Sequence, residues 1–178
     1  TDMGERKTYH RGRRKKKKGG IISTLILIIA IAVFCVSGYQ LYKIFGGYHQ
    51  GKSEYDKVRE VAVHGDDKDE DEFVVDFDEL KKINADTVGW IRFYPEPSQI
   101  SYPLVQTTDN DLYLNRTFSA NENTVGAIFV NCDNASDFSD RNTIIYGHRM
   151  RDHSMFHDLE KYKDESFWKE NPYFYIYT

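Results

Sequence analysis

One short segment of the sequence carries the residue types that proton transfer requires. The run Asn142-Thr-Ile-Ile-Tyr-Gly-His-Arg-Met150 is apolar and β-branched up to His148, and Ser154-Met-Phe156 follows closely. Such a run predicts a strand, so His148 stands where a strand stops and a loop begins, with rigid backbone behind it. Histidine exchanges protons near neutral pH and is the side chain most used for general acid–base catalysis. A histidine that only makes a local hydrogen bond is the alternative interpretation.

A histidine in this role usually serves a nucleophile, and neither cysteine of the chain suits that task. Cys35 falls inside a long apolar run, while Cys132 precedes Asp133 and lies close in sequence to Asp137 and Asp140. Negative neighbours disfavour the thiolate, which is the reactive form of cysteine. We therefore expect neither cysteine to be catalytic.

Two further histidines leave a metal site open as an alternative. His153 and His157 are spaced so that both would lie on one face of a helix, as in zinc-binding helices. The acidic residue that a zinc hydrolase places between its histidines is missing, since residues 154–156 are Ser, Met and Phe. We expect no metal and no other cofactor.

Short strands separated by turns dominate the sequence around these residues. Asp76, with Glu79 three positions later, predicts a capped helix through Ile83. Pro103 suggests that its strand lies at an edge or carries a bulge. The spacing of apolar residues predicts strands over 88–94, 100–106, 126–131, 143–146 and 173–178, a helical turn within 109–118 and a helix over 155–168. This pattern favours a mainly β fold, a mostly antiparallel sheet curled into a barrel or sandwich.

The N-terminal part predicts a membrane anchor. Residues 1–20 hold nine of the 24 Lys and Arg residues but only two acidic ones, and residues 21–41 contain no charge. Twenty-one helical residues span about 31 Å, close to the roughly 30 Å hydrocarbon core of a bilayer. The positive-inside rule then places residues 1–20 in the cytoplasm and the rest of the chain outside. Nucleic-acid binding is the alternative for the basic tract, but the adjoining span explains its charge.

The segment between the anchor and the strands is polar. Residues 48–63 show helical spacing of apolar positions, and residues 66–72 combine six acidic residues with one lysine. Such a charge run predicts a solvated linker. A calcium loop is the alternative, although the alternating ligands and the glycine of such a loop are missing.

The histidine segment closely resembles that of class B sortases, which are membrane-anchored cysteine transpeptidases of Gram-positive bacteria. Further segments are similar to the same family and occur in the same order. They are 88–91 and 102–106, similar to the first two barrel strands, 109–114 beside the substrate groove, 126–129 before the histidine, and Asp158, Leu159 and Tyr162 after it.

The resemblance implies an eight-stranded β-barrel and a two-step reaction. A cysteine thiolate attacks the sorting signal of a secreted protein, and an amine of the peptidoglycan precursor resolves the thioacyl-enzyme. By position, the resemblance makes His148 the catalytic histidine and Asn110, Leu114 and Tyr146 candidates for lining the substrate groove. The family's cysteine and arginine lie on later strands, and no residue of this chain matches them. The implied partners are sorting-signal proteins, a cell-wall amine and membrane lipid through residues 21–41, with no nucleic acid.

Four segments follow from these patterns: a basic cytoplasmic tail (1–20), a transmembrane anchor (21–41), a helical and acidic stalk (42–72) and a partial sortase barrel (73–178). Because residues 173–178 read as a strand, we expect the chain to be truncated before the nucleophile and inactive alone. A non-catalytic, membrane-anchored interaction module with a sortase-like half-barrel is the alternative function.

Overall fold

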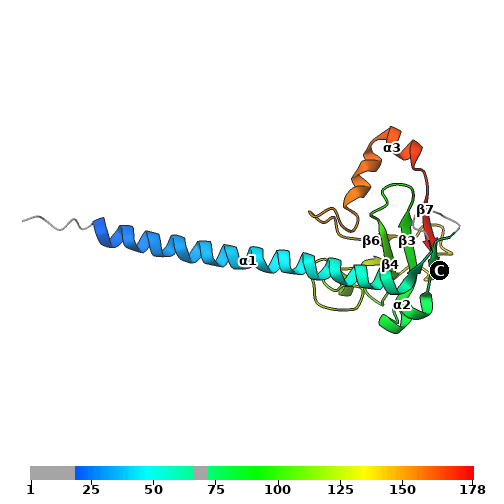
Figure 1. The fold of residues 1–178 in the computed structure, drawn as a ribbon, viewed down its shortest axis with the longest axis horizontal. Coiled ribbons are helices and arrows are strands. Elements are labelled where there is room, and N and C mark those ends of the chain that lie inside the picture. Colours follow the sequence, from blue (N-terminus) through cyan, green and yellow to red (C-terminus); the bar gives the residue numbers. More distant parts are fainter. Residues whose placement is uncertain (1–18, 66–71) are drawn as a thin grey trace, which may run out of the picture. The chain divides into compact units, whose positions relative to one another are not determined.

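The computed structural model describes residues 19–65 and 72–178, so the basic tail and most of the acidic run lie outside the described residues. The chain divides into two compact units, Thr1–Leu41 and Tyr42–Thr178. The elements, some of them labelled in Figure 1, are α1 (Gly19–Ala62), β1 (Val63–His64), β2 (Val74–Val75), α2 (Phe77–Ile83), β3 (Thr87–Phe93), β4 (Ser101–Val105), the 3-10 helix η1 (Leu112–Leu114), β5 (Ile128–Val130), β6 (Ile145–Tyr146), the 3-10 helix η2 (His157–Lys163), α3 (Glu165–Glu170) and β7 (Phe174–Tyr177).

The part of α1 in the first unit is an apolar helix with exposed side chains. Among the described residues, α1 is the helix that is long and apolar enough to cross a membrane. An apolar surface of this kind is stable in lipid and costly in water. The structure thus contains a candidate membrane anchor, as the sequence predicts, and the four segment boundaries stay predictions.

The part of α1 in the second unit packs into the core. Tyr55, Val58 and Ala62 recur at helical spacing and are all buried with the core residues of the sheet. Gly51 permits the close approach, because a Cβ at this position would lie 3.0 Å from the Val125 side chain. The helix predicted over residues 48–63 is therefore confirmed, and it contributes one wall of the folded unit.

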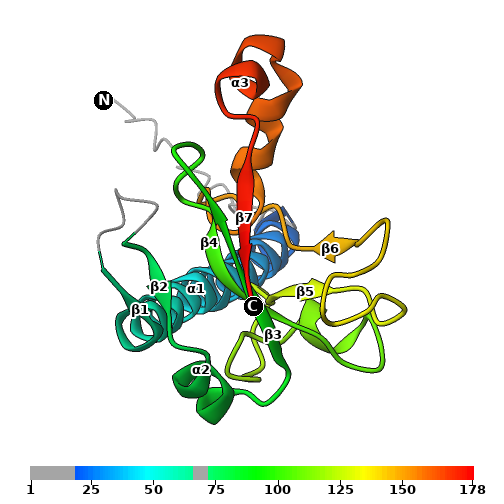
Figure 2. The same ribbon diagram turned by 90° about the vertical axis from the view of Figure 1, so that its right-hand side faces the viewer.

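A five-stranded sheet forms the centre of the second unit (Figure 2). Its order is β6-β5-β4-β3-β7, and all neighbours are antiparallel except β4 and β5, which run parallel. A separate pair, β1 with β2, was not predicted because each strand has only two residues. The curled sheet with short helices confirms the predicted fold class, while the parallel pair departs from the antiparallel expectation.

Pro103 shows why a proline is tolerated inside this sheet. β4 lies between β3 and β5, so the strand as a whole is not an edge. Its register with β5 begins at Leu104, whereas Pro103 faces Trp90 of β3 only. The missing N–H of the proline therefore removes no bond to β5.

The region after β6 differs from the single helix predicted over residues 155–168. Residues His157–Lys163 form η2, and Asp164 then adopts an extended conformation and caps α3 by accepting a hydrogen bond from the Ser166 N–H at 2.9 Å. A side chain that competes for backbone hydrogen bonds ends one helix and starts the next. By contrast, the helix predicted from Asp76 is confirmed, since the Glu79 N–H donates to the Asp76 carboxylate at 3.0 Å.

Candidate active site

His148 lies two residues beyond the end of β6, which pairs with β5 through Phe129 and Tyr146. Its Nε2 atom is 2.6 Å from the backbone carbonyl oxygen of Leu114, at the end of η1. A carbonyl can only accept, so Nε2 carries the hydrogen and Nδ1 of the neutral ring is left as an acceptor. The arrangement fixes which ring nitrogen can take up a proton.

Gly126 forms the floor beneath the His148 ring. A Cβ built on Gly126 would lie 2.7 Å from the His148 Cδ2 atom and 2.9 Å from the carbonyl oxygens of Tyr113 and Leu114. The backbone of Gly126 also has a φ of +67°, which side-chain-bearing residues rarely adopt. The position requires glycine both for space and for conformation.

The Phe156 ring packs on the backbone next to the histidine, at Gly147. The Phe156 N–H donates to the His148 carbonyl at 2.9 Å, which ties the backbone of the candidate site to the loop before η2. A Cβ on Gly147 would lie 2.6 Å from the Phe156 ring, so the ring packs directly on the backbone there. Met150 is buried in the core.

Tyr55 of α1 supports the floor from below. Its hydroxyl donates to the Gly126 carbonyl at 2.8 Å and accepts from the Phe118 N–H at 3.2 Å. The hydroxyl thus satisfies two backbone groups in the interior, where an unpaired group is costly. A residue of the N-terminal helix thereby helps to set the position of the glycine under His148.

A second network holds the η1 side of the site. Asn84, which ends α2, donates its side-chain amide to the Tyr113 hydroxyl and to the Phe118 carbonyl, both at 2.6 Å. The Tyr113 hydroxyl donates in turn to Asp86 at 2.8 Å. Burial raises the pKa of Tyr113 to about 12, so the hydroxyl keeps its proton and this donation persists at neutral pH. Hydrogen bonds to its hydroxyl therefore hold Tyr113, whose carbonyl is one of the two next to Gly126.

Asn110 and Tyr146 lie in a neighbouring part of the same unit. The Asn110 side chain accepts a hydrogen bond from the Cys132 N–H at 2.9 Å. The Tyr146 hydroxyl accepts from the Asn131 side chain at 3.0 Å, and its ring stacks on Phe129 with centroids 5.1 Å apart. The two candidate groove residues thus bond to adjacent residues of one loop, Tyr146 to residue 131 and Asn110 to residue 132.

Of the sequence-predicted residues, His148 and Leu114 are in direct contact, through a backbone carbonyl rather than the Leu114 side chain. Asn110 and Tyr146 are joined to the loop after β5. Sequence reasoning missed the supporting residues Tyr55, Asn84 and Gly126. A signal existed only for Gly126, because a glycine directly before an apolar strand often marks a close backbone approach.

The two cysteines occupy different surroundings in the structure. Cys35 is exposed on the apolar part of α1, and Cys132 is half-buried in the loop after β5. Both are free thiols. No hydrogen bond within the described residues joins the Cys132 thiol to His148, and the expectation that neither cysteine is catalytic stays a prediction.

Comparison with known proteins gives a consistent answer, although the chain matches no protein-family model. It is 35% identical over 155 residues to sortase B of Listeria monocytogenes and 30% identical over 148 residues to sortase B of Staphylococcus aureus. Each match covers 83% of this chain and 60% of the relative, so the chain spans about three fifths of the relatives' length.

The fold leads to the same family. The crystal structure of sortase B from B. anthracis in complex with AAEK1 matches with a TM-score of 0.65 and 35% identity, covering 76% of this chain and 64% of that one. Agreement in both sequence and three-dimensional structure at this level reflects common descent rather than shared architecture alone. Over the part of these relatives that it spans, the chain is homologous to class B sortases in both sequence and fold.

Proposed function

We propose that this chain provides the membrane anchor, the general acid–base histidine and part of the substrate groove of a cysteine transpeptidase. The observation that carries the proposal is the fixed ring of His148, with Nε2 on the Leu114 carbonyl and the ring against Gly126. A general acid–base group needs a defined orientation and a free nitrogen, and this arrangement supplies both.

In the proposed reaction, His148 Nδ1 transfers protons at the two chemical steps. A thiolate attacks the carbonyl of the sorting signal, and the protonated imidazole gives its Nδ1 proton to the leaving amine. The neutral ring then accepts a proton from the incoming cell-wall amine as it attacks the thioacyl carbon. The Leu114 carbonyl accepts from Nε2–H throughout, so it stabilises the imidazolium that exists before the first step and after the second.

The substrate side of the proposal rests on Leu114, whose carbonyl contacts this ring, and on two residues of the neighbouring part of the unit. Asn110, Leu114 and Tyr146 would line the groove for the sorting signal, beside the loop that carries Cys132. The nucleophile is assigned neither to Cys132 nor to Cys35, so we expect these 178 residues alone to be inactive. The apolar helix would hold the protein in the cell membrane with residues 1–20 in the cytoplasm and the sheet outside.

A chimera tests the proposal. Residues 42–178 would replace the matching part of the Listeria monocytogenes sortase B, which shares 35% identity with this chain. We expect the chimera to cleave a fluorogenic sorting-signal peptide, and His148→Ala to lower kcat by at least about 100-fold. His49→Ala, at an exposed position of α1, is the matched control and should leave kcat unchanged.

Two outcomes would contradict the proposal. One is a chimera whose circular dichroism shows a folded sheet but which cleaves nothing, or which keeps its rate in His148→Ala. The other is turnover by the 178-residue chain alone that survives Cys132→Ala and is lost in His148→Ala, because the account of the nucleophile would then be wrong.

A non-catalytic interaction module is the second candidate, favoured by β7. This strand is the outermost strand of the sheet, next to β3. Phe174 at its start is half exposed, and the preceding Tyr173 is more exposed still. An outer strand with exposed apolar side chains can accept a partner strand. The inactive folded chimera described above is the outcome that favours this function.

A further inference from the structure

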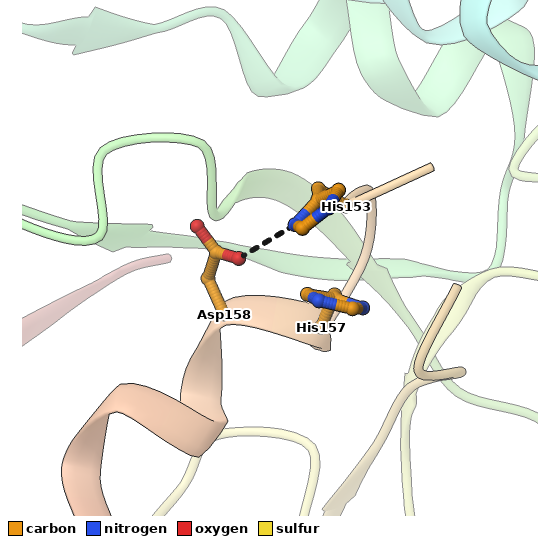
Figure 3. A group of neighbouring side chains, drawn as sticks. All are labelled: His153, His157 and Asp158. Carbon is orange, nitrogen blue, oxygen red and sulfur yellow. Dashed lines mark ion pairs between the residues drawn. The ribbon is translucent and has the colours of Figure 1, made fainter. Parts of the chain in front are cut away.

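A group of metal-ligating side chains lies beside the candidate active site and plays no part in the proposed reaction. His153, His157 and Asp158 each direct a ligand atom to a common region, and these atoms all lie within 4.8 Å of one another (Figure 3). The two imidazole rings are 4.1 Å apart between centroids. The His153 Nδ1 atom is 3.6 Å from the Asp158 Oδ1 atom, the ion pair drawn in Figure 3.

The loop before η2 brings the three together without a shared helix face. His157 and Asp158 open η2, whereas His153 precedes it in a turn with a φ of 66°. Met155, with a φ of 55°, is buried and donates its N–H to the Tyr102 hydroxyl at 3.1 Å. Because Met155 is held in place, the backbone changes direction between His153 and η2. This turn brings the His153 ring next to Asp158.

His157 is oriented as a metal ligand would be. Its Nδ1 atom is 2.5 Å from the Met150 carbonyl oxygen, so Nδ1 carries the hydrogen and the Nε2 lone pair is free. Metal-binding histidines commonly donate their second ring N–H to a backbone carbonyl or carboxylate, which fixes the ring and the tautomer. The contact therefore supplies the supporting interaction that such a ligand needs.

The carboxylate divides its two oxygens between different partners. Asp158 is 6% exposed, with Oδ2 at 3.0 Å from the Lys161 Nζ atom and Oδ1 directed toward His153. Oδ1 is therefore the atom available to a metal, and Lys161 would remain on Oδ2. The lysine also sets a limit on affinity, because its charge repels a cation bound nearby.

Two imidazoles and one carboxylate select a class of metal. Imidazole suits zinc and its first-row neighbours, while calcium and magnesium prefer sites made of oxygen ligands. Ligand bonds of about 2.0–2.1 Å in a tetrahedral site place ligand atoms roughly 3.3 Å apart, so the three atoms must approach further. The His153 side chain is 71% exposed and has the freedom to make this movement.

We propose that His153, His157 and Asp158 bind a divalent first-row transition ion such as Zn²⁺, with the fourth position open to solvent. The ion would fasten the loop whose Phe156 packs on Gly147 and donates to the His148 carbonyl. The metal ion would therefore stabilise the loop next to the candidate active site. The proposal of a metal site does not depend on whether His148 is catalytic.

Metal titration of the 178-residue chain in detergent micelles tests the proposal. Co²⁺ is added while its visible absorption is recorded, and Zn²⁺ is then used to displace it. We expect one ion to bind to the wild-type chain at this site. His153→Gln should weaken the binding by at least about tenfold, because the loss of a residue that only supports a metal ligand already lowers metal affinity by about that factor. His49→Gln makes the same chemical change at an exposed helix position and should bind as wild type.

Lys161→Met distinguishes a metal site from a side-chain cluster that only stabilises the fold without a metal. Removing the cation from Asp158 should tighten Zn²⁺ binding several-fold, although it removes an ion pair from the folded protein. The proposal is overturned if the single variants His153→Gln and His157→Gln both bind Zn²⁺ as tightly as wild type. It is also overturned if the wild-type chain binds Zn²⁺ no tighter than a variant that carries both substitutions.

Discussion

Replacing Gly126 by alanine should damage the candidate active site through a single methyl group. An alanine at a φ of +67° is strained by about 1–2 kcal/mol relative to glycine. The methyl would also stand 2.7 Å from the His148 ring and 2.9 Å from two carbonyl oxygens. Overpacking of this kind costs roughly 1–3 kcal/mol. We therefore expect Gly126→Ala to lower the free energy of unfolding by about 2–5 kcal/mol.

Gly46→Ala is the matched control for this substitution. Gly46 lies in α1, and a Cβ there would have nothing within 4 Å. Alanine favours a helix over glycine by roughly 0.5–1 kcal/mol, so the control should be neutral or slightly stabilising. Urea unfolding of the full chain in micelles, followed by near-ultraviolet circular dichroism of the buried Trp90, measures both variants.

The histidine itself gives the second measurement. Long-range ¹H–¹⁵N spectra report which nitrogen of His148 carries hydrogen, and Gly126→Ala should displace the ring and disturb the Nε2 signal. Equal stability of Gly126→Ala and Gly46→Ala would refute the reasoning about conformation and space. A destabilised variant with unchanged His148 signals would refute the contact between ring and glycine.

Three further outcomes follow from the hydrogen bonds around the site. Tyr55→Phe leaves two interior backbone groups unpaired and should lower the free energy of unfolding by about 2–4 kcal/mol in urea titrations, while the exposed control Tyr42→Phe should change it little. Asn84→Asp turns a donor into a carboxylate that faces a carbonyl, and the same titration should show a loss of about 3 kcal/mol or more. Asp140 accepts hydrogen bonds from a backbone N–H and a side-chain amide of its loop, which hold its pKa below the usual value. Its stabilising contribution is therefore complete above the unfolded pKa near 3.8 and is lost as pH falls through the lower folded pKa. The decline in the urea midpoint between pH 6 and pH 3 should be smaller in Asp140→Asn than in Asp133→Asn, an exposed control in the same loop.

Features set by neighbouring residues were predictable from the sequence. The cap of α2 at Asp76 depends on a side chain and an N–H three residues apart, and it is confirmed. The placement of His148 just beyond a short strand depends on the apolar run before it, and β6 confirms that strand. The resemblance to class B sortases depended on several such segments in order, and the comparisons confirm it.

Features set by residues far apart in the sequence were not predictable. Nothing near Leu114 indicates that its carbonyl receives His148, because that contact joins residues 34 positions apart. Tyr55 was read as one apolar position of a helix, whereas its hydroxyl bonds to a backbone group 71 positions away. Arg92 is buried between the rings of Phe73 and Tyr94, although a charged residue in a strand predicts exposure. Tertiary packing determines the burial and contacts of such residues, and these cannot be predicted from the local sequence pattern.

The pairing of β3 with β7 has a consequence for how the protein is made. Arg92 on β3 and Tyr177 on β7 lie side by side although 85 positions separate them in the chain. At about 5–20 residues per second, the ribosome needs roughly 4–17 s to make the intervening segment. During this interval the outer side of β3 has no strand beside it, and Trp90 and Phe93 lack their pairing partners on β7. The interval is one in which the nascent chain is open to association with other chains, so conditions that slow translation should raise the fraction that aggregates.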